Sequence, residues 1–309
     1  MATLLYTHPI CIDHDPGNNH PECPDRLRSV MEGFELKEFD DLQRMEAPIV
    51  GIAEIEQNHQ ASYVAEVLDS MPIEGRVYLD PDTSMSPSSG EATRRSAGAV
   101  CDAINKVIGG EANNAFCAVR PPGHHAESNR AMGFCLFNSI AIGAKYAREN
   151  HGLKRVAVVD FDVHHGNGTQ HSLEKDSGMF YASSHQFPAY PGTGAVEECG
   201  QYNNICNFPM SPGEGSKAFR KGYQNDILPA LREFKPELLL ISAGFDAHER
   251  DPLAQINLKA DDYDWVTGEL LSIAAEFCGG NVVSLLEGGY DLSALKESCQ
   301  AHVRVMMQS

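Results

Sequence analysis

Basic residues are scarce in this 309-residue chain, which has 24 Lys and Arg against 43 Asp and Glu and a formal net charge of −19. A nucleic-acid-binding protein of this size usually has a basic face, so we expect no direct binding of DNA or RNA. The chain also lacks a basic and apolar leader at its N-terminus and any apolar run of about 18 residues. We therefore expect a cytoplasmic protein that neither crosses nor binds a membrane.

Paired cysteine motifs are absent as well. The nine cysteines are scattered through apolar stretches, and none forms a Cys-x-x-Cys pair. This pattern argues against a thiolate zinc site and against a disulfide framework, and it favours a reduced compartment. No internal repeat, low-complexity segment or long linker interrupts the chain, and 42% of its residues are hydrophobic. We expect a single domain over residues 1–309 with a sizeable core.

Continuous apolar runs alternate with helical patterns along the whole chain. Such runs are typical of parallel strands that are covered on both faces. The expected strands are 3–7, 115–119, 155–161, 179–183, 237–242 and 281–286, and the expected helices include 89–108, 137–149, 216–234 and 261–277. The alternation predicts a three-layer α/β domain with a mostly parallel sheet.

Polar, glycine-containing stretches follow most of these strands. They read "RPPGHHAE", "DFDVHHGNGTQ", "SAGFDAHERDP" and "LEGGYD". In open α/β sheets the ligand site lies beyond the carboxyl ends of the strands. We therefore expect four loops, from four strands, to meet at one site.

Three side chains in these loops predict a metal site. Asp162 and His164 lie two residues apart, and Asp246 follows another buried strand. A carboxylate oxygen and an imidazole nitrogen suit zinc, and three protein ligands leave a position open for catalysis. Two ordinary interpretations stay open at this point: Asp162 and His164 as a hydrogen-bonded pair in a loop, and Asp246 as a helix N-cap.

The remaining polar residues of the four loops suit proton transfer and oxyanion binding. His124 and His125 follow Pro-Pro-Gly, and Asp160 and Asn167 are available to fix their tautomers. Tyr290 follows two glycines and can donate its hydroxyl to a developing oxyanion. The alternatives are two surface histidines and a buried core tyrosine.

Taken together, the motifs resemble those of the zinc-dependent histone deacetylase family. The resemblance points to its class II branch and to bacterial relatives grouped with the acetylpolyamine amidohydrolases. It rests on "HPECPDRL", "RPPGHHAE", "GFCLFN", "VVDFDVHHGNGTQ", "SAGFDAHERDPL" and "LEGGYDL", which occur in family order over residues 20–292. It implies an arginase-like α/β/α fold with an eight-stranded, mostly parallel sheet.

The resemblance also implies roles for individual residues. The zinc ligands would be Asp162, His164 and Asp246, and Fe(2+) is an alternative ion. The catalytic group would be His124, His125, Tyr290, Asp160 and Asn167, and the histidine at position 165 would be structural. Gly133, Phe134, Tyr190, Leu253 and Asp82 would line the substrate tunnel and its rim. A structural K(+) ion would be held around Asp160, Asp162, His164, Ser183 and Ser184.

The implied activity is hydrolysis of an acyl-lysine amide in a peptide or protein. His125, opposite the neutral Asn167, would act as base, whereas His124, paired with the charged Asp160, would stay more cationic. Leu253 stands where polyamine-selective members have an acidic residue, which favours acyl-lysine over small acetylated amines. A binuclear arginase would need further Asp and His ligands, and a non-catalytic acyl-lysine reader would be expected to lack a ligand or the tyrosine. The oligomeric state is not predicted.

Overall fold

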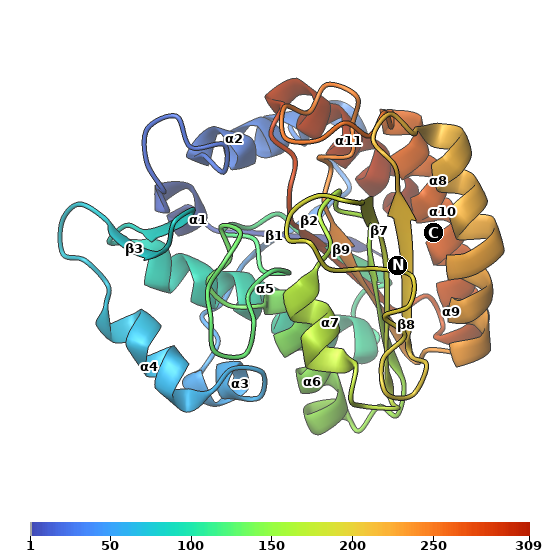
Figure 1. The fold of residues 1–309 in the computed structure, drawn as a ribbon, viewed down its shortest axis with the longest axis horizontal. Coiled ribbons are helices and arrows are strands. Elements are labelled where there is room, and N and C mark those ends of the chain that lie inside the picture. Colours follow the sequence, from blue (N-terminus) through green and yellow to red (C-terminus); the bar gives the residue numbers. More distant parts are fainter. Residues whose placement is uncertain (1) are drawn as a thin grey trace.

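A sheet of eight parallel strands runs through the centre of the protein in the order β2-β1-β5-β10-β9-β6-β7-β8 (Figure 1). The computed structural model describes residues 2–309. The strands are β1 (Thr3–Thr7), β2 (Gln43–Glu46), β5 (Asn114–Cys117), β6 (Val156–Asp160), β7 (Met179–Gln186), β8 (Ile205–Met210), β9 (Leu238–Ala243) and β10 (Val282–Leu286). All of their pairings are parallel. The predicted α/β fold with an eight-stranded sheet is confirmed.

Helices cover both faces of this sheet. On one face α5 and α6 pack on the central strands, with α7 beside β7; on the other lie α2 and α8 to α11. The helices on the two faces are α2 (Pro24–Gly33), α5 (Ser89–Ile108), α6 (Ser139–His151), α7 (Asn167–Leu173), α8 (Ser216–Gly222), α9 (Leu228–Phe234), α10 (Ala260–Phe277) and α11 (Leu292–Met307). Over residues 2–309, none of the helices combines the length and the apolar composition that a membrane span requires.

The remaining elements lie in the amino-terminal part of the chain. They are α1 (Ile10–Asp13), a 3-10 turn (Lys37–Phe39), α3 (Ile52–Glu56), α4 (Ala61–Asp69) and the antiparallel hairpin of β3 (Val77–Asp80) and β4 (Thr83–Met85). The hairpin region projects from the left of the molecule in Figure 1. It brings Asp82 to the carboxyl edge of the sheet, where its carboxylate accepts a hydrogen bond from the Gly133 amide at 3.2 Å.

Sequence patterns located the six central strands to within a few residues but missed the two edge strands. The missed strands are β2, with the sequence QRME and mostly exposed side chains, and β8, which contains Pro209. An edge strand can have polar side chains and a proline because one side of its backbone needs no partner. The expected helix 216–234 forms as α8 and α9, joined by a π-helical turn over Tyr223–Ile227.

A buried ion cluster joins three segments at the carboxyl edge of the sheet. Glu22, Arg26 and Arg120 are each fully buried. The Glu22 carboxylate accepts hydrogen bonds from Arg120 Nη2 at 2.6 Å and from Arg26 Nη1 at 2.8 Å. Arg26 also donates to the carbonyl oxygen of Gly289 at 2.6 Å. The cluster therefore fixes the segment before α2 to the loops that follow β5 and β10.

Glu22→Gln is expected to lower the free energy of unfolding by about 3–5 kcal/mol, because it leaves two buried guanidinium groups without their carboxylate. Denaturant unfolding would measure the loss. Glu38→Gln, which breaks an exposed pair with Arg304, is the control and should cost at most about 1 kcal/mol. Equal losses in the two variants would contradict this account of the cluster.

Candidate active site

Four loops meet at the carboxyl edge of the sheet, as the positions of their motifs predict. They follow β5, β6, β9 and β10, which are neighbours in the sheet. The buried Glu287 joins two of these loops, since its Oε2 accepts hydrogen bonds from the amides of Gly123 at 2.6 Å and His124 at 3.2 Å. Burial raises the pKa of Glu287 to about 7, against the opposing effect of His124.

Asp162, His164 and Asp246 form a compact cluster of three possible metal ligands. One ligand atom from each lies within 4.8 Å of the other two. His164 Nδ1 is 3.0 Å from Asp246 Oδ2 and 3.3 Å from Asp162 Oδ1. Burial and the neighbouring Asp162 carboxylate raise the pKa of Asp246 to about 7, against the lowering effect of His164. Two buried carboxylates that face one imidazole nitrogen are a donor set that fits a divalent cation such as zinc.

Two glycines allow these carboxylates to pack against the backbone. A Cβ atom at Gly244 would overlap the Asp162 carboxylate, and one at Gly288 would overlap those of Asp162 and Asp246. The Gly288 amide also donates to Asp162 Oδ2 at 2.8 Å. The Val163 amide donates to Asp246 Oδ1 at 2.8 Å. Backbone donors and the absence of side chains at these glycines thus set the direction of both carboxylates.

His124 lies beside two of the acids. Its Nδ1 is 3.1 Å from Asp160 Oδ2, and its Nε2 is 3.8 Å from Asp162 Oδ1. Burial lowers the pKa of His124, but the charges of Asp162 and Asp160 outweigh burial and raise it to about 10. The two acids thus favour the protonated form of the ring.

His125 lies in a different electrostatic environment from its neighbour. Its Nδ1 is 2.9 Å from Oδ1 of Asn167, at the start of α7. Burial, followed by the charges of His124 and His164, lowers the pKa of His125 well below its usual value. A neutral ring whose Nδ1–H donates to Asn167 keeps a lone pair on Nε2. The pKa values of two adjacent histidines are thus shifted in opposite directions.

Tyr290 is held at the end of the loop after β10. Its ring lies under the Arg26 guanidinium, whose Cζ is 4.9 Å from the ring centroid, and its amide donates to Asp251 Oδ2 at 2.7 Å. Burial raises the pKa of the phenol, against the lowering effect of Arg26. The hydroxyl therefore stays protonated and can donate a hydrogen bond.

A cavity of about 190 Å³ connects these groups to the surface. Its lining residues are Asp82, His125, Gly133, Phe134, His164, Tyr190, Leu253 and Tyr290. The ring centroids of Phe134 and Tyr290 are 5.9 Å apart, and those of Tyr190 and His125 are 5.2 Å apart. Tyr190 and Leu253 are 43% and 40% exposed, so they lie at the mouth. All five residues expected at the tunnel and its rim line this cavity.

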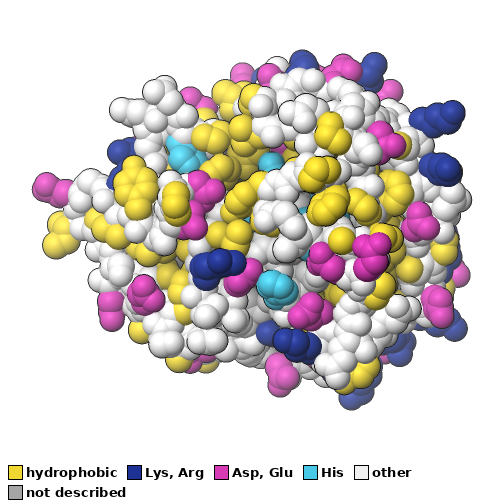
Figure 2. Space-filling view, in the orientation of Figure 1, with side chains coloured by type: hydrophobic (Ala, Val, Ile, Leu, Met, Phe, Trp, Pro, Cys, Tyr) yellow, Lys and Arg dark blue, Asp and Glu magenta, His cyan; other side chains and the backbone are white. Residues whose placement is uncertain are grey.

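The mouth exposes both hydrophobic and acidic groups. In Figure 2, histidine side chains show between hydrophobic ones in the upper half of the face, with Asp and Glu interspersed. Asp82 Oδ1 accepts from the Thr83 hydroxyl at 2.9 Å. Burial raises the pKa of Asp82, and the nearby Asp80 adds to the increase.

The residues expected around potassium lie on β6, on β7 and in the loop after β6. Asp160 pairs with Ser183 across these strands. The Ser183 hydroxyl is 2.9 Å from His185 Nδ1, and the Ser184 hydroxyl is 3.3 Å from the Tyr223 hydroxyl. The potassium site stays a prediction.

His165 lies apart from the three metal-ligand candidates. Its Nδ1 is 2.7 Å from the Thr193 hydroxyl, and its Nε2 is 2.9 Å from Gln170 Oε1. Both ring nitrogens are thus occupied by structural partners.

Several buried charged residues of this region were not identified from the sequence. They are Glu22, Arg26, Arg120, Asp251 and Glu287, which support the site without lining the metal cluster. Glu22 and Arg26 belong to "HPECPDRL", and Glu287 belongs to "LEGGYDL". These charged residues lie within recognised motifs but had no assigned role, and that combination could have indicated their importance.

Comparisons with known proteins agree with this geometry. The model of the Histone deacetylase domain matches residues 20–306. The chain is 32% identical to Histone deacetylase 14, chloroplastic, of Arabidopsis thaliana, over 99% of this chain and 77% of that protein. It is 37% identical to the Histone deacetylase-like amidohydrolase of Pseudomonas aeruginosa, over 87% of this chain and 71% of that protein.

A solved structure described as the HDA15 HD domain superposes with a TM-score of 0.94 and 33% identity, covering 100% of this chain and 88% of that one. Proteins of the matched family are hydrolases and are generally metal-dependent. The family model and these relatives together cover nearly the whole chain. The chain therefore belongs to the histone deacetylase family.

Proposed function

We propose that this protein is a zinc-dependent amidohydrolase that removes acetyl or other acyl groups from the ε-amine of lysine in peptides or proteins. The observation that carries the proposal is the cavity whose lining includes His125, His164 and Tyr290 beside the buried carboxylates of Asp162 and Asp246. We assign the activity to one catalytic domain over residues 1–309. The nine free cysteines support a reducing, cytoplasmic setting.

The proposed roles follow from the protonation states of the side chains. A divalent ion on Asp162, His164 and Asp246 would polarise the acyl carbonyl and lower the pKa of the attacking water. His125 then accepts the water proton at Nε2, since its Nδ1–H is already donated to Asn167. The Tyr290 hydroxyl donates to the developing oxyanion.

His124 has an electrostatic role in this scheme. The Asp162 and Asp160 carboxylates raise the pKa of His124, which favours a cationic ring. A cation that does not release its proton near neutral pH cannot act as the base, but it stabilises negative charge that develops in the site. His125, with its lowered pKa, carries the proton to the leaving amine of lysine.

The residues of the cavity walls suit a long, thin substrate chain. Phe134 and Tyr190 contribute aromatic side chains, and Gly133 and Phe134 have φ angles of 57° and 69°. A Cβ at Gly133 would overlap the His125 ring, so glycine keeps this wall clear. Leu253 at the mouth is uncharged, which favours acyl-lysine as the substrate. The alternative substrate is a small acetylated amine, and the acidic residues near the mouth support that alternative.

The assignment of ions goes with this proposal. We propose Zn(2+) as the resident ion, with Fe(2+) as the alternative, because imidazole and carboxylate ligands suit both. We also propose K(+) as a structural ion at Asp160, Asp162, His164, Ser183 and Ser184.

Gly288→Ala is expected to weaken zinc affinity by about 10- to 100-fold, because the added methyl group would displace the Asp162 and Asp246 carboxylates. Competition with a chromophoric chelator would measure the change. Gly268→Ala in α10 is the matched control, since its Cβ would meet only Val305 Cγ1 at 3.9 Å. Unchanged zinc affinity in Gly288→Ala would argue against this metal site.

His125→Ala is expected to reduce kcat by about 10²–10⁴-fold, the range for loss of a general base. His124→Ala should leave a measurable remnant, because the ring next to Asp160 acts through its charge. Steady-state kinetics on an acetyl-lysine peptide, with zinc content measured in both variants, would separate the two roles. Equal losses at equal zinc occupancy would contradict this division.

The proposed function is tested by a substrate panel of acetyl-lysine peptides, longer acyl-lysine peptides and N-acetylpolyamines, compared by kcat/KM. Acyl-lysine peptides should be preferred, and a chelator should abolish turnover until zinc is restored. Leu253→Glu should shift the preference toward acetylpolyamines, because it places a carboxylate at the exposed mouth. A preference of the unmodified protein for acetylpolyamines would reverse the substrate assignment.

A further inference from the structure

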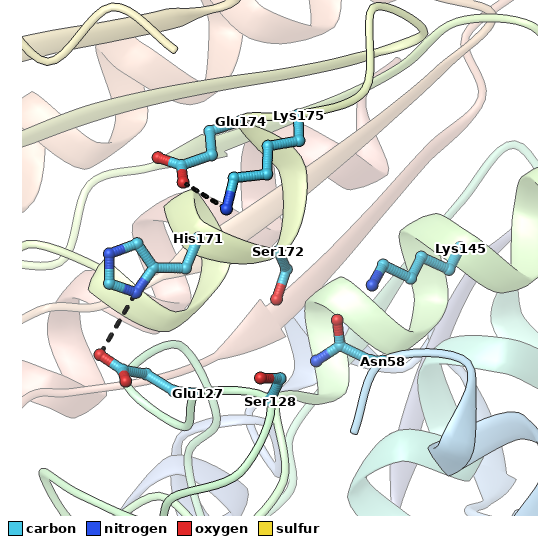
Figure 3. Close-up of a pocket in the computed structure, with 8 residues that line it drawn as sticks. All are labelled: Asn58, Glu127, Ser128, Lys145, His171, Ser172, Glu174 and Lys175. Carbon is cyan, nitrogen blue, oxygen red and sulfur yellow. Dashed lines mark ion pairs between the residues drawn. The ribbon is translucent and has the colours of Figure 1, made fainter. Parts of the chain in front are cut away.

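A second recess lies outside the substrate cavity, next to α7. Its volume is about 360 Å³, and it shares no lining residue with the substrate cavity. Figure 3 shows its lining residues, Asn58, Glu127, Ser128, Lys145, His171, Ser172, Glu174 and Lys175. One of them, Glu127, also reaches the active site.

The Glu127 carboxylate contacts three side chains through Oε1. It accepts a hydrogen bond from Asn167 Nδ2 at 2.9 Å and lies 2.9 Å from Arg130 Nη2 and 3.3 Å from His171 Nδ1. The His171 contact is the lower dashed line in Figure 3. Glu127 is thus contacted by two basic side chains, of which His171 lines the recess, and it accepts a hydrogen bond from Asn167.

This contact determines which end of the Asn167 amide faces His125. Asn167 Oδ1 is 2.9 Å from His125 Nδ1. The other acceptors near Nδ2 are more distant, namely the His125 carbonyl oxygen at 3.4 Å and Met132 Sδ at 3.3 Å. If the amide turned over, its oxygen would face the Glu127 carboxylate, and two acceptors would be left in contact. The carboxylate therefore excludes the reversed amide.

The direction of the amide in turn determines the tautomer of His125. In the observed direction Asn167 accepts from Nδ1–H, and the lone pair stays on Nε2. In the reversed direction the amide would donate to Nδ1, the ring proton would move to Nε2, and the ring could not take a proton there. The reversed amide thus corresponds to an inactive histidine.

We propose that Glu127 is a positioning residue for proton transfer: it holds the Asn167 amide in the direction that keeps His125 in the Nδ1–H tautomer. The proposal rests on the proposed function, in which His125 is the base. Glu127 does not line the substrate cavity, and in this proposal it acts only through Asn167.

The backbone at Glu127 has its own anchors, so the role of the side chain can be tested separately. The Glu127 amide donates to the Arg130 carbonyl oxygen at 2.9 Å, and its carbonyl oxygen lies 2.9 Å from the His59 ring nitrogen Nδ1. Replacing the side chain leaves both contacts in place. Glu174 is a matched control, since it also lines the recess but, within residues 2–309, its carboxylate pairs only with Lys175, at 3.7 Å.

Glu127→Ala is expected to lower kcat on an acetyl-lysine peptide by roughly tenfold to hundredfold, the size of a lost charge-assisted hydrogen bond. KM should change little, because the tunnel walls are untouched. Glu174→Ala should retain the kcat of the unmodified protein. Glu127→Gln should fall between the two, because a glutamine can present either its oxygen or its NH₂ group to Asn167.

The decisive comparison uses Asn167→Asp, because a carboxylate accepts from Nδ1–H with either oxygen and has no reversed form. In the Asn167→Asp background, Glu127→Ala should not reduce kcat. If the new carboxylate at position 167 and that of Glu127 repel each other, removing Glu127 should increase kcat. The proposal would be overturned if Glu127→Ala reduced kcat by the same factor with aspartate at position 167 as with asparagine. A purely structural role of Glu127 predicts equal losses of kcat in the two backgrounds.

A spectroscopic measurement separates this proposal from the proposed function. In ¹⁵N-histidine-labelled, zinc-loaded protein, His125 is identified as the ring missing from His125→Gln. Its nitrogen shifts should report the Nδ1–H tautomer in the unmodified protein and in Glu174→Ala, and a shift toward Nε2–H in Glu127→Ala. Unchanged His125 shifts in Glu127→Ala would overturn the positioning role, whatever substrate the protein acts on.

Discussion

Buried negative charge at the carboxyl edge of the sheet is the constraint on which the active site depends. Six carboxylates with at most 8% exposure gather there: Glu22, Asp160, Asp162, Asp246, Asp251 and Glu287. Buried acids require cations or several donors. Arg26 and Arg120 satisfy Glu22, backbone amides satisfy Asp251 and Glu287, and His124 with a divalent ion would satisfy the rest. The same balance raises the pKa of His124, whereas burial and neighbouring histidines lower that of His125.

The sequence carried most of the information on the site because its main elements are local. The polar residues that follow a strand lie within a few positions of its apolar run, so the four loops and their meeting at one site could be predicted. The edge strands β2 and β8 could not, because an edge strand needs neither continuous apolar residues nor full hydrogen bonding. The Glu22 cluster and the Glu127–Asn167 contact join residues 98 and 40 positions apart, and no spacing rule indicates such pairs.

Asn167, the partner of the proposed base His125, connects the active site to Glu127. An aspartate at position 167 would accept from His125 in either orientation, but its charge would raise the pKa of the ring. Burial and two neighbouring histidines lower the pKa of His125, and a neutral asparagine does not counter this. An amide, however, has a donor end as well as an acceptor end. A neutral partner therefore needs a third residue that distinguishes its two ends. Glu127 has that property because its carboxylate accepts hydrogen bonds and does not donate them. Arg130 and His171 contact the same oxygen, Oε1, that accepts from Asn167.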